Sequence, residues 1–371
     1  MQRLSAISRH LTPPRSATAV GPSAAEAAPR LRVGVIGTGG MGGRHAMNLA
    51  HRINGATVNG IFDMDEARAA AVAGECGGAT VFGSAEALIE SADIDAVVIA
   101  SPDSTHAGLA LSCVRAGKNV LCEKPLAPSV AEALAVVEAE VASGRRVIQL
   151  GFMRQYDPAH VRVKEALERG DIGRPLMFRG VHSNLHNRDN PYFDDVHAVA
   201  TNAAVHDFHS ARWLMGQEIT HVQAQAVVGE PHPEGAGGCR LLLAQLTMAD
   251  GAVGVVEMNV DSGYGYDVKV EVTGSEGSLV SAETANPTLR QAGTVGQGIA
   301  GIEGWLDRFV ETYVIQVDAW VQSLRATGGP TGPTAYDGYA SLSVADAALR
   351  SIESHSREEV QLTMPLPALY H

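Results

Sequence analysis

The sequence lacks any long apolar run: apolar residues nowhere continue for the roughly 20 positions that a membrane-spanning helix needs. Cysteine is also scarce, because the chain has only 4 cysteines and none of them forms a C-x-x-C pair. Such spacing supports neither a zinc site nor a disulfide framework. We therefore expect reduced thiols in a cytoplasmic protein, with no membrane contact and no bound metal.

Basic residues are outnumbered as well. The chain has 28 lysines and arginines against 41 aspartates and glutamates, which gives a formal net charge of −13 and a pI near 5.5. Nucleic acids are bound by basic patches that face the phosphates, so this balance argues against a nucleic-acid partner. It is mildly favourable to a neutral or cationic substrate. With 371 residues, of which 45% are hydrophobic, the chain is long enough for two domains with buried cores.

Residues 1–30 differ from the rest in composition. They are rich in alanine, serine, proline and arginine, and Glu26 is their one acid. A segment of this kind buries too little apolar surface to fold, so we expect a disordered extension. A transit peptide or a misassigned start codon is an alternative, whereas a secretory signal would need an apolar stretch that is absent here.

A glycine-rich turn follows the first apolar strand. The stretch LRVGVIGTGGMGGRHAMNLA (31–50) has the pattern of strand, turn and helix, and Gly37, Gly39 and Gly42 fit G-x-G-x-x-G. The first glycine permits a tight turn, the second lets a pyrophosphate approach the backbone, and the third lets the helix pack on the strand. Backbone N–H groups and the helix dipole would then face the phosphates. The motif alone is weak, since such a turn can exist without a ligand.

A second strand, ATVNGIFD (56–63), ends in Asp63 and strengthens the nucleotide prediction. Asp63 comes 63 − 42 = 21 residues after Gly42, close to the roughly 20 expected for the acid that binds the adenosine ribose. A carboxylate there accepts hydrogen bonds from the 2′-hydroxyl and repels a 2′-phosphate. Met64 and Asp65 follow, with no basic residue immediately beside Asp63, so NAD is favoured over NADP. Asp65 is the better candidate for capping the next helix.

Further strands and helices alternate up to residue 152. This pattern predicts an α/β fold with a doubly wound parallel sheet, in which ligands bind at the carboxyl ends of the strands. Ser101, Pro102, Lys124 and Arg154 lie at those ends. Residues 175–282 contain strand-like segments separated by glycine and polar turns, and they are followed by long helical stretches at 305–329 and 338–355.

The turn CEKPLA (122–127) carries a resemblance to the Gfo/Idh/MocA oxidoreductases, which extends from about Arg32 to the C-terminal region. Within that family the chain is most similar to the inositol 2-dehydrogenases. The resemblance rests on the order and spacing of GFMRQYDPAH, GDIGRPLM, VHSN, VHDFHSARWLMGQEI, GYGYDVKVEVTGSEGS and PTAYDGYASLSVADAALRS. It implies an N-terminal Rossmann domain (31–152) that binds NAD. It also implies a substrate-binding and oligomerisation α/β domain (153–371) with an open, mainly antiparallel sheet, whose C-terminal helix packs back toward the Rossmann domain.

The resemblance also implies roles for particular residues. Lys124, in Glu123-Lys124-Pro125, would bond the substrate hydroxyl beside the nicotinamide, and the peptide bond before Pro125 is often cis in relatives. With Asn202 and His206, which matches the catalytic histidine, it forms the catalytic set. The implied cofactor-binding residues are Gly37, Gly39, Gly40, Met41, Gly42, Asp63, Ser101, Pro102, Glu123 and Lys124. The implied substrate-binding residues are Met153, Arg154, His182, Asn184, Asn202, His206 and Tyr264.

The helix that would carry the catalytic histidine departs from the family pattern. Asn202, His206, His209 and Trp213 follow i, i+4, i+7 and i+11, so one helix face would present them together. Inositol dehydrogenases usually have an aspartate at the place of Asn202 and another acid at the place of His209. A carboxylate would raise the pKa of His206, whereas an amide supplies no charge. The substrate could therefore differ from myo-inositol, and proton transfer could use Lys124 and His206 alone or recruit His209.

Some of these residues also have a structural interpretation. For His209, packing or surface exposure is favoured over a catalytic role. Tyr264 and Tyr266 are alternate residues of a strand, so one of them packs, and Tyr264 is the candidate for the site. Asp207 is expected to be solvated or to lie near the cofactor rather than to act as a base.

The sequence thus favours an NAD-dependent dehydrogenase that oxidises a secondary alcohol of a cyclitol or sugar to the ketone. His206 would take the hydroxyl proton while Lys124 bonds the developing alkoxide. Open alternatives are a dehydrogenase of an amino sugar or aminocyclitol, an enzyme of acyclic polyols or lactones, and a nucleotide-binding regulatory protein without turnover. Asp189, Asp194 and Asp195 would favour an amine-bearing substrate if their loop borders the pocket. The resemblance implies a homodimer or homotetramer.

Overall fold

The computed structural model describes residues 29–185, 195–229, 238–263, 265–281, 290–293, 296–299, 302 and 304–371. Residues 1–28 of the predicted extension, the loop acids Asp189 and Asp194, and Tyr264 lie outside the described residues. No helix in the described part of the chain combines the length and apolar character needed to cross a membrane.

The first half of the chain builds a six-stranded, fully parallel sheet in the order β3-β2-β1-β4-β5-β6. Its strands are β1 (Leu31–Ile36), β2 (Ala56–Phe62), β3 (Thr80–Val81), β4 (Ala96–Ile99), β5 (Asn119–Cys122) and β6 (Ile148–Leu150). The helices between them are α1 (Gly40–His51), α2 (Glu66–Glu75), α3 (Ala85–Glu90), α4 (Asp103–Ala116) and α5 (Val130–Ser143). The chain winds outward from β1 and then outward from β4, which confirms the predicted doubly wound sheet and puts the switch point between these two strands.

Alternate side chains of these strands enter two different cores. Val33 and Val35 of β1 pack with helices α1 and α2 on one face of the sheet, where Trp320 of a C-terminal helix joins them. Val97 and Ile99 of β4 point to the opposite face, which α3, α4 and α5 cover. Because both faces are buried at the centre of the sheet, strand β4 is a continuous apolar run rather than an alternating one.

The second half of the chain builds a seven-stranded sheet in the order β12-β11-β7-β10-β9-β8-β15. Neighbouring strands are antiparallel except for the parallel pair β7 and β10, which confirms the mainly antiparallel sheet. Its strands are β7 (Pro175–Leu185), β8 (Ile219–Val228), β9 (Cys239–Met248), β10 (Val253–Ser262), β11 (Asp267–Gly274), β12 (Ser278–Val280) and β15 (Glu358–Glu359). A separate hairpin consists of β13 (Arg290–Gly293) and β14 (Gly296–Ile299).

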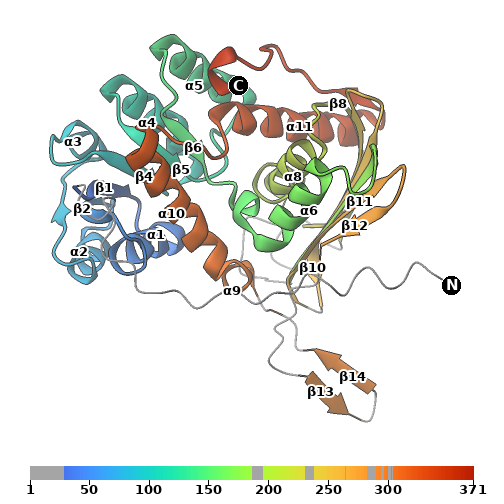
Figure 1. The fold of residues 1–371 in the computed structure, drawn as a ribbon, viewed down its shortest axis with the longest axis horizontal. Helices are drawn as coiled ribbons and strands as arrows, with labels where there is room; N and C mark the ends of the chain where they lie inside the picture. Colours follow the sequence, from blue (N-terminus) through green and yellow to red (C-terminus); the bar gives the residue numbers. More distant parts are fainter. Residues whose placement is uncertain are drawn as a thin grey trace.

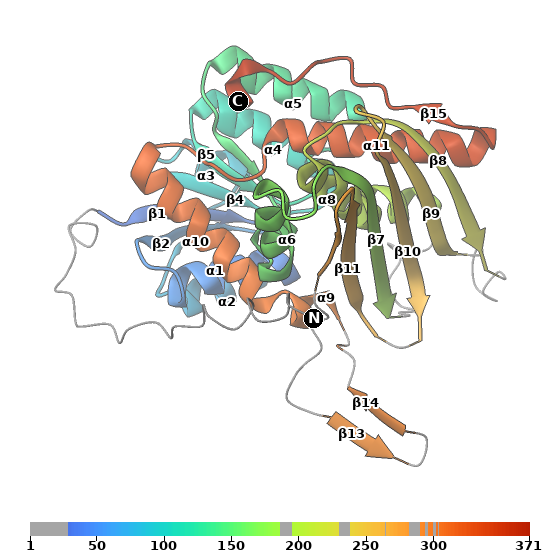
Figure 2. The same ribbon diagram turned by 45° about the vertical axis from the view of Figure 1, so that its right-hand side comes forward.

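Helices lie on the side of the second sheet that faces the first one (Figures 1 and 2). They are α6 (Pro158–Glu168), α7 (Val196–Ala198), the π-helix η3 (Val199–Ala204), α8 (Val205–Met215) and α11 (Ala335–Ser354). Two short 3-10 helices are η1 (Met153–Tyr156) and η4 (Ala368–Tyr370). Along β10, Val256 and Met258 are buried, whereas Val253 at the start of the strand is exposed. Thus one face of the sheet joins the core and the other carries exposed residues.

The stretch predicted as one helix at 305–329 forms two. These are α9 (Trp305–Arg308) and α10 (Val310–Thr327), and the break falls at the fully buried Phe309. Arg308 pairs there with the buried Asp157 at 2.9 Å, a contact from far along the chain that local periodicity does not reveal. Helix α10 lies across the first sheet, where Trp320 is fully buried. Helix α11 begins three residues before the predicted 338, because Thr334 and Asp337 form a capping box.

Candidate functional site

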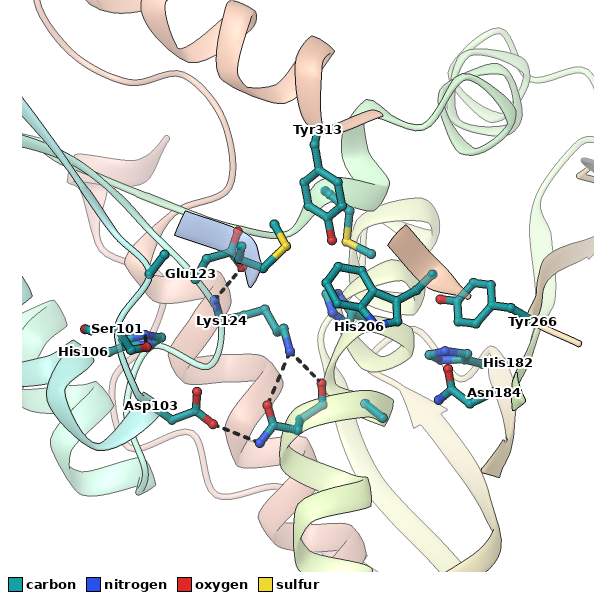
Figure 3. Close-up of a pocket in the computed structure, with 16 residues that line it drawn as sticks. Ser101, Asp103, His106, Glu123, Lys124, His182, Asn184, His206, Tyr266 and Tyr313 are labelled. Atoms are coloured by element: carbon teal, nitrogen blue, oxygen red, sulfur yellow. Dashed lines mark hydrogen bonds between the residues drawn. The ribbon is translucent and has the colours of Figure 1, made fainter. Parts of the chain in front are cut away.

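A cavity of about 380 Å³ lies at the carboxyl ends of β4 and β5, between the two sheets (Figure 3). The lining side chains come from the glycine turn, the segments after β4, β5 and β6, strand β7, the η3–α8 segment, the residue before β11, and helices α9 and α10. The lining residues are Met41, Ala100, Ser101, Asp103, His106, Glu123, Lys124, Met153, His182, Asn184, Asn202, Ala203, His206, Tyr266, Trp305 and Tyr313.

The glycine turn has the shape of a dinucleotide cradle. Gly37 has φ +83°, a left-handed conformation, and a Cβ there would lie 2.6 Å from the carbonyl oxygen of Ala100. A Cβ on Gly42 would lie 1.7 Å from the carbonyl oxygen of Gly37, so only glycine lets α1 start this close to β1. A Cβ on Gly39 or Gly40 would meet no heavy atom within 4 Å, so the outer side of these two glycines is open to a ligand. The turn therefore fits a pyrophosphate at the N-terminus of α1.

Asp63 lies at the end of β2 as predicted, but its carboxylate is already hydrogen-bonded. It accepts bonds from the backbone N–H and hydroxyl of Thr38 at 2.7 and 2.8 Å, and from the backbone N–H of Asp65 at 2.9 Å. Arg68 completes the set with an ion pair at 2.6 Å. Burial alone would raise the pKa of Asp63, but these bonds, led by Arg68, hold it well below its usual value.

A basic residue thus lies beside Asp63 in space although none follows it immediately in the sequence. Arg68 is in the first turns of α2, and its backbone N–H donates to Asp65, which caps that helix as predicted. Arg68 comes five residues after Asp63 in the sequence. This spacing indicates a contact between the two side chains only if the helix is known to begin at Glu66.

Lys124 leaves β5 in the turn Glu123-Lys124-Pro125, where the peptide bond before Pro125 is cis, as the resemblance implied. Oε1 of Glu123 lies 2.8 Å from Nε2 of the buried His45. Nζ of Lys124 donates to the backbone oxygen and to Oδ1 of Asn202, at 3.1 and 3.3 Å. Burial lowers the pKa of Lys124, and the negative charges of Glu123 and Asp103 oppose that shift.

His206 lies on the wall of the same cavity and is 7% exposed. Its Nδ1 is buried without a hydrogen-bond partner among the described residues, and the ring meets Phe152 edge-on at 5.9 Å. Burial, reinforced by the positive charges of Lys124 and Arg154, puts the pKa of His206 well below its ordinary value. The imidazole is therefore neutral near pH 7, the form that a proton acceptor needs.

Asn202 does not pair with His206 among the described residues, although the helical spacing suggested that they could meet. It lies in the π-helix η3, so the regular i, i+4 geometry assumed from the sequence is wrong here. Its amide contacts Lys124 and Asp103 instead.

Arg154 and Asp207 form a buried pair behind the cavity wall. Nη1 of Arg154 lies 2.6 Å from Oδ1 of Asp207, and Nδ1 of His182 lies 2.9 Å from Oδ2 of the same carboxylate. Asp207 is fully buried, so the expectation of a solvated residue is wrong. Arg154 was expected to border the substrate, but it is not among the lining residues. Its guanidinium instead contacts Nδ1 of His182, and His182 lines the cavity.

His209 is 1% exposed and takes no part in the lining. Its ring stacks on Phe152 at 4.0 Å with 8° between the planes, and its Nε2 lies 2.9 Å from the amide nitrogen of Gln155. Burial lowers the pKa of His209 to about 3. These contacts agree with the structural interpretation and leave His206 as the histidine of α8 that reaches the cavity.

The sequence reasoning missed several lining residues. Tyr266, expected to pack, lines the cavity edge-on to His182 at 5.5 Å, while its alternate Tyr264 lies outside the described residues. Asp103 directly follows the predicted Ser101-Pro102 turn, so its place at the end of a strand could have indicated that it lines the cavity. Trp305 and Tyr313 come from distant helices, and no local pattern indicates them. Among the described residues, no cluster of His, Cys, Asp or Glu could hold a metal ion.

Comparisons with known proteins agree with this geometry. Residues 31–152 match the sequence profile of an oxidoreductase family with an NAD-binding Rossmann fold, and residues 160–280 match the GFO/IDH/MocA C-terminal domain. The chain is 46% identical to an inositol 2-dehydrogenase of Rubrobacter xylanophilus, over 92% of this chain and 96% of that one. It is 42% identical to inositol 2-dehydrogenase 1 of Saccharopolyspora erythraea, over 92% and 99%.

A solved structure has the same fold. It is a myo-inositol dehydrogenase from Lactobacillus casei in complex with NAD(H) and myo-inositol, with a TM-score of 0.84 and 31% sequence identity. The match covers 92% of this chain and all of that one. With both profiles matched in order and relatives aligned over nearly their full length, the chain belongs to the GFO/IDH/MocA family of NAD-dependent oxidoreductases.

Proposed function

We propose that this protein oxidises a secondary hydroxyl of a cyclitol of the inositol class to the ketone, with NAD as the oxidant. One observation carries the proposal: Lys124 and the neutral His206 line one cavity beside the glycine turn. The names of its relatives, inositol 2-dehydrogenases, supply the substrate class.

NAD would lie along the carboxyl edge of the first sheet. The turn from Gly37 to Gly42 would hold the pyrophosphate, and Asp63 the adenosine ribose. Ser101, Pro102 and Glu123 would border the half that carries the nicotinamide. When bound, NAD supplies the ring carbon that accepts a hydride.

Lys124 and His206 have different roles in the proposed reaction: one stabilises negative charge and the other accepts a proton. His206 takes the proton of the reacting hydroxyl, since its unprotonated ring is the stable form in this buried place. The Lys124 ammonium donates to the same oxygen as negative charge develops on it. In a site shielded from water, such a fixed donor lowers the barrier more than it would in bulk solvent.

The opposite wall suits a ring that carries many hydroxyls. His182, Asn184 and Tyr266 offer a histidine nitrogen, an amide and a phenol, and Met153 adds an apolar surface. Of the loop acids that could have favoured an amine, Asp195 caps the short helix α7 by accepting from Ala198. The two carboxylates of the described wall, Asp103 and Glu123, are engaged by Asn202 and His45, so we favour a neutral cyclitol over an aminocyclitol or amino sugar.

The direct test is a substrate panel with NADH formation as the signal. It includes myo-inositol, scyllo-inositol, other inositol stereoisomers, free hexoses, acyclic polyols and aminocyclitols. We expect the highest kcat/KM for an inositol. Turnover confined to an amino sugar or an acyclic polyol would replace the proposed substrate class, and absence of turnover despite tight NAD binding would favour a regulatory protein.

Cofactor preference gives a separate prediction about Asp63. Replacing it by serine removes the charge that repels a 2′-phosphate and releases Arg68, which can then meet that phosphate. We expect the ratio of kcat/KM for NAD to that for NADP to fall about 10- to 100-fold, the scale of a lost hydrogen bond to a charged group. Asp65→Ser is the matched control, since serine keeps the helix cap. Equal kcat/KM for both cofactors in the unmodified protein would contradict the assignment.

We further propose a cytoplasmic homo-oligomer. Free cysteines at 76, 113, 122 and 239 agree with a reducing compartment. Val227, Val228 and Val253, with exposed fractions of 55%, 57% and 47%, lie at ends of strands of the second sheet, where a second copy could cover them. Light scattering on the purified chain would give the number of copies.

A further inference from the structure

The ammonium of Lys124 is held by a residue that carries no charge. Within the described part of the chain, both of its hydrogen bonds go to Asn202, one to the backbone oxygen at 3.1 Å and one to Oδ1 at 3.3 Å. An amide oxygen orients an ammonium group but does not neutralise it. The negative charge that balances Lys124 must therefore come from carboxylates that its ammonium does not touch.

The other end of the same amide leads to a carboxylate. Nδ2 of Asn202 donates to Oδ2 of Asp103 at 3.0 Å, so the contacts run from Lys124 through Asn202 to Asp103 (Figure 3). This direction is fixed by chemistry, because a flipped amide would put its NH₂ against an ammonium and its oxygen against a carboxylate. Asp103 is the first residue of α4 and lines the cavity.

We propose that Asp103 is a positioning residue that acts through Asn202 to hold Lys124, as an ammonium, against the reacting oxygen. This inference deepens the proposed function and rests on it for the identity of that oxygen. It assigns to Asp103 the negative charge that an aspartate at position 202 would otherwise supply. The residues at positions 103 and 202 therefore depend on each other. A carboxylate at 202 would lie about 3.0 Å from the Asp103 carboxylate, the distance of the present contact. Like charges at that distance repel.

Of the other charged groups around Lys124, Glu123 also supplies a negative charge, but among the described residues it hydrogen-bonds neither Asn202 nor the ammonium. Glu123, on the same turn, is engaged by His45 and by the backbone N–H of Lys124. Arg154 on η1 is itself a cation, so it cannot balance the positive charge of Lys124. His182 on β7 and His206 on α8 also face Lys124, and burial lowers the pKa of both, which keeps them neutral near pH 7. The negative charges of Glu123 and Asp103 both raise the pKa of Lys124 against the effect of burial.

The test moves the carboxylate from one position to the other. Three variants of the full chain are compared with the unmodified protein: Asp103→Asn, Asn202→Asp, and the double variant with both changes. The matched control is Glu132→Gln, which neutralises an exposed acid in the first turn of α5, a helix of the same length as α4. For each we measure kcat and KM against pH, the NAD dissociation constant and Tm. Competitive acetylation with acetic anhydride, read by mass spectrometry in the presence of NAD, gives the pKa of Lys124 without turnover.

Asp103→Asn should lower kcat about 10-fold with little change in KM, because the amide can still accept the bond from Asn202 but no longer supplies the charge that holds the lysine as an ammonium. It should also lower the pKa of Lys124 by about one unit, since a nearby opposite charge is lost. The ammonium is the active form, so the fall of kcat at high pH should move to lower pH by the same amount. Asn202→Asp should also impair kcat, because two carboxylates then face each other. The double variant should restore both kcat and the pKa of Lys124, and Glu132→Gln should change neither.

An unmoved Lys124 pKa in Asp103→Asn, or a double variant no better than the single ones, would overturn the proposal. A loss of Tm or of NAD affinity in Asp103→Asn with an unmoved pKa would do the same and would make Asp103 a structural residue. Acetylation needs no substrate. The role of Asp103 is therefore decided even if no cyclitol is oxidised, and failure of the substrate panel is a separate result.

Discussion

Replacing Lys124 by alanine is expected to lower kcat about 100-fold or more, while the NAD dissociation constant changes little. Among the described residues that line the cavity, Lys124 is the one lysine or arginine, and losing a positioned donor to a developing oxyanion has an effect of about 10²–10³-fold. Steady-state kinetics with the best inositol from the panel measures kcat, and titration of NAD by tryptophan fluorescence measures binding.

Lys124→Met serves as the companion variant because it keeps most of the side-chain volume and removes the charge. It should be as impaired as Lys124→Ala. Activity near that of the unmodified protein in the methionine variant would mean that Lys124 only fills space beside the cofactor.

Replacing His206 by alanine should remove most activity, by about 10²–10⁴-fold, the contribution of a positioned general base. The pH dependence provides the sharper result. A base is active when it is unprotonated, so kcat/KM of the unmodified enzyme rises with pH through the folded pKa of His206. Because that pKa lies well below 6.5, the rise should be complete before pH 6.5, and the profile should then stay flat until Lys124 begins to lose its proton. In His206→Ala the acid-side rise should disappear.

His209→Gln separates this result from a general disturbance of α8. It should lower Tm, because the ring that stacks on Phe152 is lost, but it should leave the acid-side rise in place. If His206→Ala keeps its activity and its pH profile, the hydroxyl proton leaves by another route.

The two sheets could be predicted from the sequence because their signals are local. A glycine turn after an apolar strand, and then alternating strands and helices, allow few arrangements other than a doubly wound sheet. The apolar and polar pattern of ITHVQAQAVV predicts a strand at 219–228, and the structure has a strand with these bounds. Lys124 and His206 could be assigned to one cavity because the first follows a strand of the first sheet and both lie in stretches shared with the family.

The details that depend on contacts between distant residues could not be predicted. The pair Arg154 and Asp207, separated by 53 positions, explains why two polar residues are buried rather than solvated. The contact between Asn202 and Asp103 spans 99 positions and leaves no trace in the periodicity of either segment. The sequence does not separate Tyr266 from Tyr264, because residues two apart on a strand share a face and the pattern does not tell which of them reaches the cavity.

The π-helical turn at Val199–Ala204 has a consequence for how such a site can vary. A π-turn amounts to one extra residue inserted in an α-helix. Deleting a single residue there would restore α-helical hydrogen bonding without appreciably rotating the flanking segments, because the π-turn already accommodates the extra residue. Asn202 would turn away from Lys124, while His206 would keep its place. The residue that faces the lysine therefore lies within the π-turn, and the residue that carries the base follows it in the regular helix. An insertion or deletion within the π-turn can move Asn202 and leave His206 in place, whereas in a regular helix it would rotate every residue on one side of the change.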